Sequence, residues 1–262
     1  LRNSLWLLLL AGSSLLAQEN LTFQKPSKEI LALAEYERAP SVTMDTKKEW
    51  MLLSYRNTYK TLDDLNQEEM RLAGLRINPK INSASRSRNF NKINIFDVKT
   101  KTEIPVSGMP VNPKITDVIW SNAQDKIAFI NTTETGVSLW VIDYDKRKAT
   151  KLTEANLNAN MGNPVAWLKD DSGLLVKFLP ANRKPLINTE NAVPAGPIIS
   201  VNEEGQKAQN RTYQDLLKNT NDEANFETLA RSELWKVSLD GKKSKWKEVS
   251  LCRSISTSPD GK

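Results

Sequence analysis

The chain has 262 residues, of which 39% are hydrophobic and 7% aromatic, enough for one large all-β unit or two ordinary domains around a packed core. It contains no histidine, which excludes a Ser-His-Asp triad, a Cys-His pair and an imidazole zinc site within this sequence. Its one cysteine, Cys252, excludes an internal disulfide, and its place next to a predicted strand favours a small buried hydrophobe.

The net charge of +6 comes from 37 basic and 31 acidic residues that are dispersed along the chain. The densest basic clusters lie beside predicted turns, so we interpret them as solvated hairpin rims and expect no nucleic-acid partner. They are Lys146, Arg147, Lys148 and Lys151, and then Lys242, Lys243, Lys245 and Lys247.

The first 20 residues have the layout of a secretory signal peptide. Arg2 precedes an apolar run from Leu5 to Leu10 that resumes at Leu15, and a polar chain begins after Ala17. We predict a signal peptide over 1–17 with cleavage after Ala17, a periplasmic or secreted protein, and no membrane contact after its removal. A buried amino-terminal helix is the alternative.

An N-terminal segment, 18–40, follows the signal peptide. Ser27 is a plausible N-cap for a short amphipathic helix within 26–36, and the run from Arg38 to Pro40 ends it. From residue 41 to 262 the chain reads as strands.

A hairpin pattern recurs in this second part. Met44, Trp120 and Trp167 each open a polar turn of five or six residues that a run of hydrophobic residues follows, and Thr257 opens a fourth turn. Such short runs, rich in β-branched and aromatic residues, are typical of β-hairpins. The openers lie 76, 47 and 90 residues apart.

A second hairpin follows the first in three copies, so the two make a four-stranded antiparallel unit. The copies are INIFDVKTKTEIPV at 93–106, LWVIDYDKRKATKL at 139–152 and LWKVSLDGKKSKWKEV at 234–249. The spacing of 47 residues in the uninterrupted middle unit matches a β-propeller blade. We therefore predict an all-β fold, a partial β-propeller of about three four-stranded blades plus the start of a fourth, over 41–262.

Two inserts account for the irregular spacing. The first, 55–92, holds a possible helix from Thr61 with Asp64 completing a capping box. The second, 180–231, is rich in Pro, Asn and Gly and then looks helical over 211–230.

Other chemistry finds little support. Asn156, Asn158, Asn160 and Gly162 resemble a calcium loop, but the ligands are uncharged and no bidentate Glu follows, which favours an Asn-rich loop between blades. We expect the paired acidic residues to lie in turns or at helix starts, and the recurring tryptophans to pack in the core between blades. The sequence also has no Gly-rich phosphate loop. We therefore predict no catalytic residue, metal or cofactor in this chain. The pairs are Asp63 and Asp64, Asp170 and Asp171, and Glu203 and Glu204; the tryptophans are Trp120, Trp140, Trp167 and Trp235.

These blade motifs resemble the propeller of prolyl oligopeptidase (S9) family serine peptidases. Three stretches are similar to the glutamyl endopeptidase branch of that family: PSKEILALAEYERAPSVTMD at 26–45, MRLAGLRINP at 70–79 and RTYQDLLKNTNDEANF at 211–226. Residues 80–88, KINSASRSR, are more basic than that branch leads us to expect, and Met44 and Thr257 replace the opening Trp.

The resemblance implies a propeller that precedes an α/β-hydrolase domain bearing Ser, Asp and His, and that admits only peptides or unfolded segments. There is no G-x-S-x-G elbow and no histidine here, so none of that triad can be assigned to this chain. We expect an inactive N-terminal fragment whose partners are that hydrolase domain and peptide substrates. A stand-alone periplasmic propeller that binds proteins without catalysis is the alternative, and a nucleic-acid binder ranks last. We expect the open blades to make the chain prone to aggregation.

Overall fold

A computed structural model of the chain describes residues 25–36, 38–188 and 215–258. The chain divides into two compact units, 1–37 and 38–262. The first contains α2 (Lys28–Ala34), which confirms the predicted helix; Ser27 is its N-cap, but the Ser27 side chain makes no capping hydrogen bond. The predicted signal peptide lies outside the described residues. Within the described residues, no helix has the length and apolar character needed to cross a membrane.

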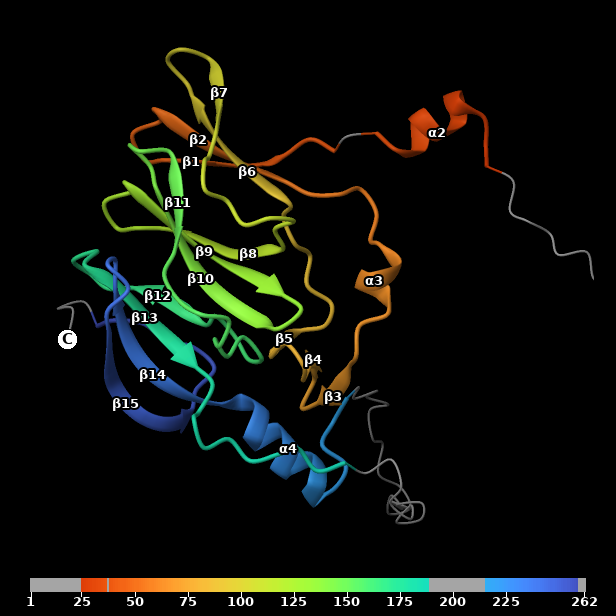
Figure 1. Cartoon of the computed structure of the whole chain (residues 1–262), viewed down its shortest axis with the longest axis vertical. Helices are drawn as coiled ribbons and strands as arrows, with labels where there is room; N and C mark the ends of the chain where they lie inside the picture. The colour runs from red at the N-terminus through yellow and green to blue at the C-terminus, as the bar shows by residue number, and fades with distance from the viewer. Residues whose placement is uncertain (1–24, 37, 189–214, 259–262) are drawn as a thin grey trace, which may run out of the picture. The chain divides into compact units, whose positions relative to one another are not determined.

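The second unit contains three four-stranded antiparallel sheets (Figure 1), which we call blades 1 to 3. In each, the order of strands in the sheet follows the order in the chain, so each is a meander. This confirms the prediction of an all-β partial propeller with three blades. Blade 1 consists of β1 (Ser41–Met44), β2 (Trp50–Tyr55), β6 (Lys92–Asp97) and β7 (Thr102–Pro105); blade 2 of β8 (Ile115–Trp120), β9 (Lys126–Thr133), β10 (Gly136–Asp143) and β11 (Lys148–Lys151); and blade 3 of β12 (Val165–Trp167), β13 (Gly173–Phe178), β14 (Arg231–Ser238) and β15 (Lys243–Leu251).

Strand β9 shows why the middle unit reads as a continuous apolar run. Ile127 and Phe129 lie in a core with blade 1, whereas Ala128 and Ile130 lie in a core with blade 3. Successive side chains of a strand point to opposite faces, so a sheet covered on both faces needs apolar residues at every position. Blade 2 is therefore the centre of the packing between blades.

The three opening turns share one geometry. Lys48, Gln124 and Asp171, each four residues after its opener, have φ of 59°, 59° and 55°. In each turn the backbone N–H of that residue donates to the carbonyl three residues earlier, at 3.0–3.2 Å. The alignment of the hairpins on their openers is thus confirmed, since the same turn recurs at the same offset.

Side chains connect these turns from blade to blade. The Thr46 backbone N–H donates to Gln124 Oε1 at 2.8 Å, which links blades 1 and 2. The Asp171 carboxylate accepts from the backbone N–H groups of Asn122 at 2.8 Å and Ala123 at 2.7 Å, which links blades 2 and 3. Polar turns thus hold the ends of neighbouring blades together beside the apolar cores.

The first insert is only partly what the sequence predicts. Helix α3 (Leu62–Leu65) has the predicted capping box between Thr61 and Asp64. A small three-stranded sheet, β3 (Met70–Leu72), β4 (Leu75–Asn78) and β5 (Ser83–Ala84), was not predicted. Strands this short carry too few residues to show a period of two.

In the second insert the predicted helix over 211–230 is too long. Helix α4 spans Thr220–Ala230, because the Asn219 side chain accepts from the Asp222 N–H at 2.9 Å and fixes the start. Residues 215–219 are not helical, and 211–214 lie outside the described residues.

Residues 252–258, which follow β15, form no strand. The expectation that Cys252 is buried is wrong, because this free cysteine is only partly buried. It follows the end of β15, and its carbonyl lies 3.4 Å from Lys177 Nζ.

Candidate functional site

The two inserts meet, although residues 93–179 separate them in the chain. Each connects the second and third strands of its blade, β2 to β6 and β13 to β14, so both leave the same end of the sheets. Leu72 and Ile77 of the first insert share a buried core with Leu229 of the second. The Gly74 backbone N–H also donates to the Asp215 carbonyl at 2.8 Å.

Three arginines of the first insert lie around one carboxylate, that of Glu69. Glu69 lies 2.8 Å from Arg71 Nε, 3.3 Å from Arg76 Nη1 and 2.8 Å from Arg86 Nε. Burial opposes the charge, but hydrogen bonds from Ser85, Arg86 and Arg71 outweigh it and hold the pKa of Glu69 at about 2. Arg86, one of the basic residues of the stretch 80–88, thus has a carboxylate partner.

The Asn-rich loop joins the inserts to blade 3. Asn158 Nδ2 donates to the carbonyls of Leu229 at 2.9 Å and Arg231 at 2.8 Å. Asn160 Nδ2 donates to the same Leu229 carbonyl at 2.9 Å. Both asparagines are buried, and both donate from their amide nitrogens. The loop lies between β11 of blade 2 and β12 of blade 3, as expected of an inter-blade loop. Among the described residues no group of three or more His, Cys, Asp or Glu could hold a metal ion.

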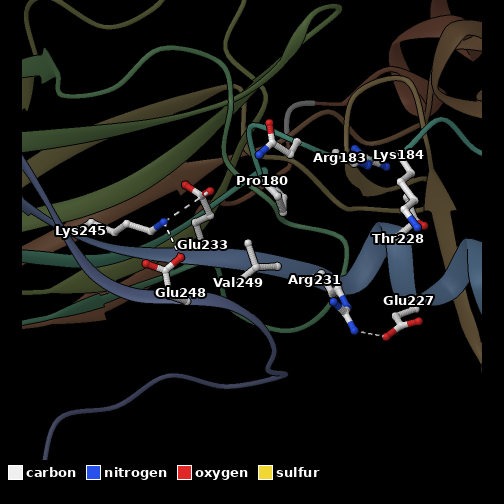
Figure 2. Close-up of a pocket in the computed structure, with 11 residues that line it drawn as sticks. Pro180, Arg183, Lys184, Glu227, Thr228, Arg231, Glu233, Lys245, Glu248 and Val249 are labelled. Carbon is white, nitrogen blue, oxygen red and sulfur yellow. Dashed lines mark hydrogen bonds and ion pairs between the residues drawn. The ribbon is translucent and has the colours of Figure 1, made fainter.

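A groove of about 440 Å³ lies between the two ends of the second insert and the last strand of blade 3 (Figure 2). Pro180, Asn182, Arg183 and Lys184 line it from the segment after β13. Glu227 and Thr228 line it from α4, Arg231 and Glu233 from β14, and Lys245, Glu248 and Val249 from β15. Its volume falls in the range of small-ligand sites.

Five of the seven charges that line the groove, two cations and three glutamates, form ion pairs with one another. Arg231 forms an ion pair with Glu227. Lys245 Nζ lies 2.7 Å from Glu248 and 3.9 Å from Glu233, and Trp235 Nε1 donates to Glu233 at 3.0 Å. Figure 2 shows these two groups of pairs on the α4 and β15 sides of the groove.

Arg183 and Lys184 have no carboxylate partner among the residues that the structure describes. The half-buried Arg183 guanidinium donates from Nη1 to Asn82 Oδ1. Burial lowers the pKa of Arg183, as expected where no anion compensates the lost hydration. Sequence reasoning missed both residues, because the groove joins three segments whose proximity depends on the path of the insert.

Within the described residues, the paired acidic residues make hydrogen bonds in turns, at a helix start or between blades. Asp64 caps α3, Asp170 accepts from Ser172 Oγ at 2.7 Å within its turn, and Asp171 links two blades. The Lys114 ammonium lies 3.4 Å from Asp64. Glu203 and Glu204 lie outside the described residues.

The recurring tryptophans pack as predicted, in or against the cores between blades. Trp167 is buried between blades 2 and 3, with Trp235 packed against that core, and Trp120 and Trp140 pack against the core between blades 1 and 2. The two basic clusters lie on the β10–β11 and β14–β15 hairpins. On the β10–β11 hairpin, Lys146 forms an ion pair with Asp143. These features belong to the scaffold.

Two plant proteins are similar to the chain in sequence. The chain is 31% identical over 258 residues to a protein of Oryza sativa subsp. japonica named probable glutamyl endopeptidase, chloroplastic, covering 92% of this chain and 27% of that protein. It is 32% identical over 236 residues to the protein of that name from Arabidopsis thaliana, covering 84% of this chain and 24% of that protein. The chain thus spans about a quarter of the length of these relatives. No family model matches it.

Solved structures of peptidases show a weaker likeness. A prolyl endopeptidase is 13% identical with a TM-score of 0.38, over 84% of this chain and 24% of that one. An acylaminoacyl peptidase is 15% identical with a TM-score of 0.36, over 79% of this chain and 25% of that one. Because both TM-scores are below 0.5, the fold assignment rests on the meander topology of the blades.

Proposed function

The chain is a relative of the glutamyl endopeptidases in the prolyl oligopeptidase (S9) family of serine peptidases, and we propose that it forms the N-terminal propeller part of such a peptidase. The similarity over 92% of the chain carries this proposal. The three blades, each a four-stranded meander, support it. The activity itself belongs to residues outside this sequence, since the chain has no histidine to serve as the base of a Ser-His-Asp triad.

In this proposal the propeller restricts entry to a hydrolase domain, so that peptides and unfolded segments reach the serine and folded proteins do not. The whole protein acts by acyl transfer at that serine and cleaves peptides after an acidic residue. We also propose that the protein is exported through the N-terminal signal over 1–17. The layout of Arg2, Leu5–Leu10 and Ala17 supports export.

Peptide cleavage by the protein in the longest form that its gene encodes tests the proposal. We expect cleavage of a fluorogenic peptide with glutamate before the scissile bond, little cleavage of the matched glutamine peptide, and inhibition by a serine-directed phosphonate. The 262-residue chain alone should cleave neither peptide.

Two results would overturn this assignment. Phosphonate-sensitive cleavage by the 262-residue chain alone would show that it carries its own catalytic serine. A gene that ends after a few more blades, with no G-x-S-x-G elbow followed by Asp and His, would instead indicate a stand-alone binding propeller.

A further inference from the structure

The groove of the second insert has one positive charge in excess, and that excess is localised. Arg183 and Lys184 come from one segment after β13, and the cations opposite them, Arg231 and Lys245, are already paired with glutamates. We propose that this groove binds an acidic side chain of an extended peptide, with Arg183 and Lys184 holding its carboxylate.

The charge pattern selects a carboxylate over a more highly charged anion. Four cations and three glutamates line the groove, so a single negative charge completes the balance. A phosphate dianion would leave a surplus of negative charge beside Glu227 and Glu233, in a site where partial burial strengthens repulsion. A guanidinium can bind a carboxylate through two parallel hydrogen bonds, which suits Arg183, since only one of its N–H groups has a side-chain acceptor among the described residues.

The position of the groove beside an edge strand favours a peptide as the bearer of that carboxylate. β15 is the outermost strand of blade 3, and it contributes Lys245, Glu248 and Val249 to the lining. One side of its backbone has no strand partner among the described residues, and such an edge can pair with an added extended segment. Val249 and Pro180 supply apolar surface for the rest of the peptide.

This inference goes beyond the proposed function, because the groove is formed wholly by residues of this chain and requires no hydrolase domain. Its test measures binding and not cleavage. Failure of peptide cleavage and failure of peptide binding can therefore be told apart.

The experiment uses the protein in the longest form that its gene encodes, after treatment with a serine-directed phosphonate. The probe is a fluorescein-labelled, C-terminally amidated hexapeptide of alternating glutamate and alanine, and its matched control carries glutamine in place of each glutamate. We expect fluorescence anisotropy to report saturable binding of the glutamate peptide and much weaker binding of the glutamine peptide. Lys184→Glu should weaken binding of the glutamate peptide by about tenfold or more, since a charge-assisted contact is replaced by a repulsion.

Lys99→Glu is the matched control variant. It makes the same change in net charge at an exposed residue of the turn between β6 and β7, and it should leave binding unchanged. Arg183→Gln should weaken binding at least as much as Lys184→Glu; if its contact with Asn82 proves necessary for folding, the exposed Lys184 still decides the question. Equal binding of the two peptides, equal effects of Lys184→Glu and Lys99→Glu, or tighter binding of inorganic phosphate than of the glutamate peptide would each overturn the proposal.

Discussion

The substitution Asn158→Asp separates the structural role of the Asn-rich loop from a role in calcium binding. In a calcium loop a carboxylate at this position would strengthen the site. In the structure, Asn158 is 1% exposed, and its amide nitrogen donates to the carbonyls of Leu229 and Arg231. Aspartate cannot donate when ionised, so the Arg231 carbonyl loses this donor, whereas the Leu229 carbonyl keeps Asn160; the expected loss is about 1–3 kcal/mol before the cost of a buried charge.

Urea unfolding followed by tryptophan fluorescence measures this loss. Asn156→Asp is the matched control, because Asn156 is exposed in the same loop and should tolerate the charge at a cost below about 0.5 kcal/mol. Burial should raise the pKa of the carboxyl introduced by Asn158→Asp above its unfolded value, so this variant should be least stable at high pH and recover as pH falls. Equal unfolding midpoints for the two variants, or a calcium-dependent rise in stability of Asn158→Asp, would refute the reasoning.

Three further predictions concern the scaffold. Thr61→Ala removes the capping box of α3 and should destabilise the first insert by about 1 kcal/mol, measurable as faster amide exchange over that insert with unchanged exchange in blade 2. Asp171→Ala removes the acceptor of the exposed Asn122 and Ala123 N–H groups and should cost about 0.5–1.5 kcal/mol per hydrogen bond in urea unfolding, because water can replace the carboxylate; Asp170→Ala, confined to its own turn, should cost less, and the opposite order would contradict a link between blades. Because the folded pKa of Glu69 is lowered to about 2, its carboxylate stabilises the fold at pH values above its unfolded pKa, and this stabilisation is lost as pH falls from about 5 to 2. Glu69→Gln should therefore flatten the pH dependence of the unfolding midpoint in that window. An unchanged slope would argue against stabilisation by the ion pairs of Glu69.

The blades could be predicted because their signals are local. A turn with positive φ at Lys48, Gln124 and Asp171 needs only a few neighbouring residues to form, so it leaves a repeated pattern of polar residues after each opener. The capping box of Thr61 and Asp64 is local in the same way. Residues 252–258 form no strand, since a strand depends on a neighbouring strand, and local sequence does not show whether such a partner is present.

The sequence by itself determined the meander of each blade and the relationship to glutamyl endopeptidases. Both depend on features of neighbouring residues: hydrophobic runs, turn residues, and stretches that are similar to those of the relatives. The tertiary structure decided how the two inserts join and where Arg183 and Lys184 lie. It also placed the amide nitrogens of Asn158 and Asn160 within hydrogen-bond distance of the Leu229 carbonyl. These outcomes depend on contacts between segments far apart in the chain, such as the contact of Leu72 with Leu229. A local sequence pattern does not show whether such contacts form.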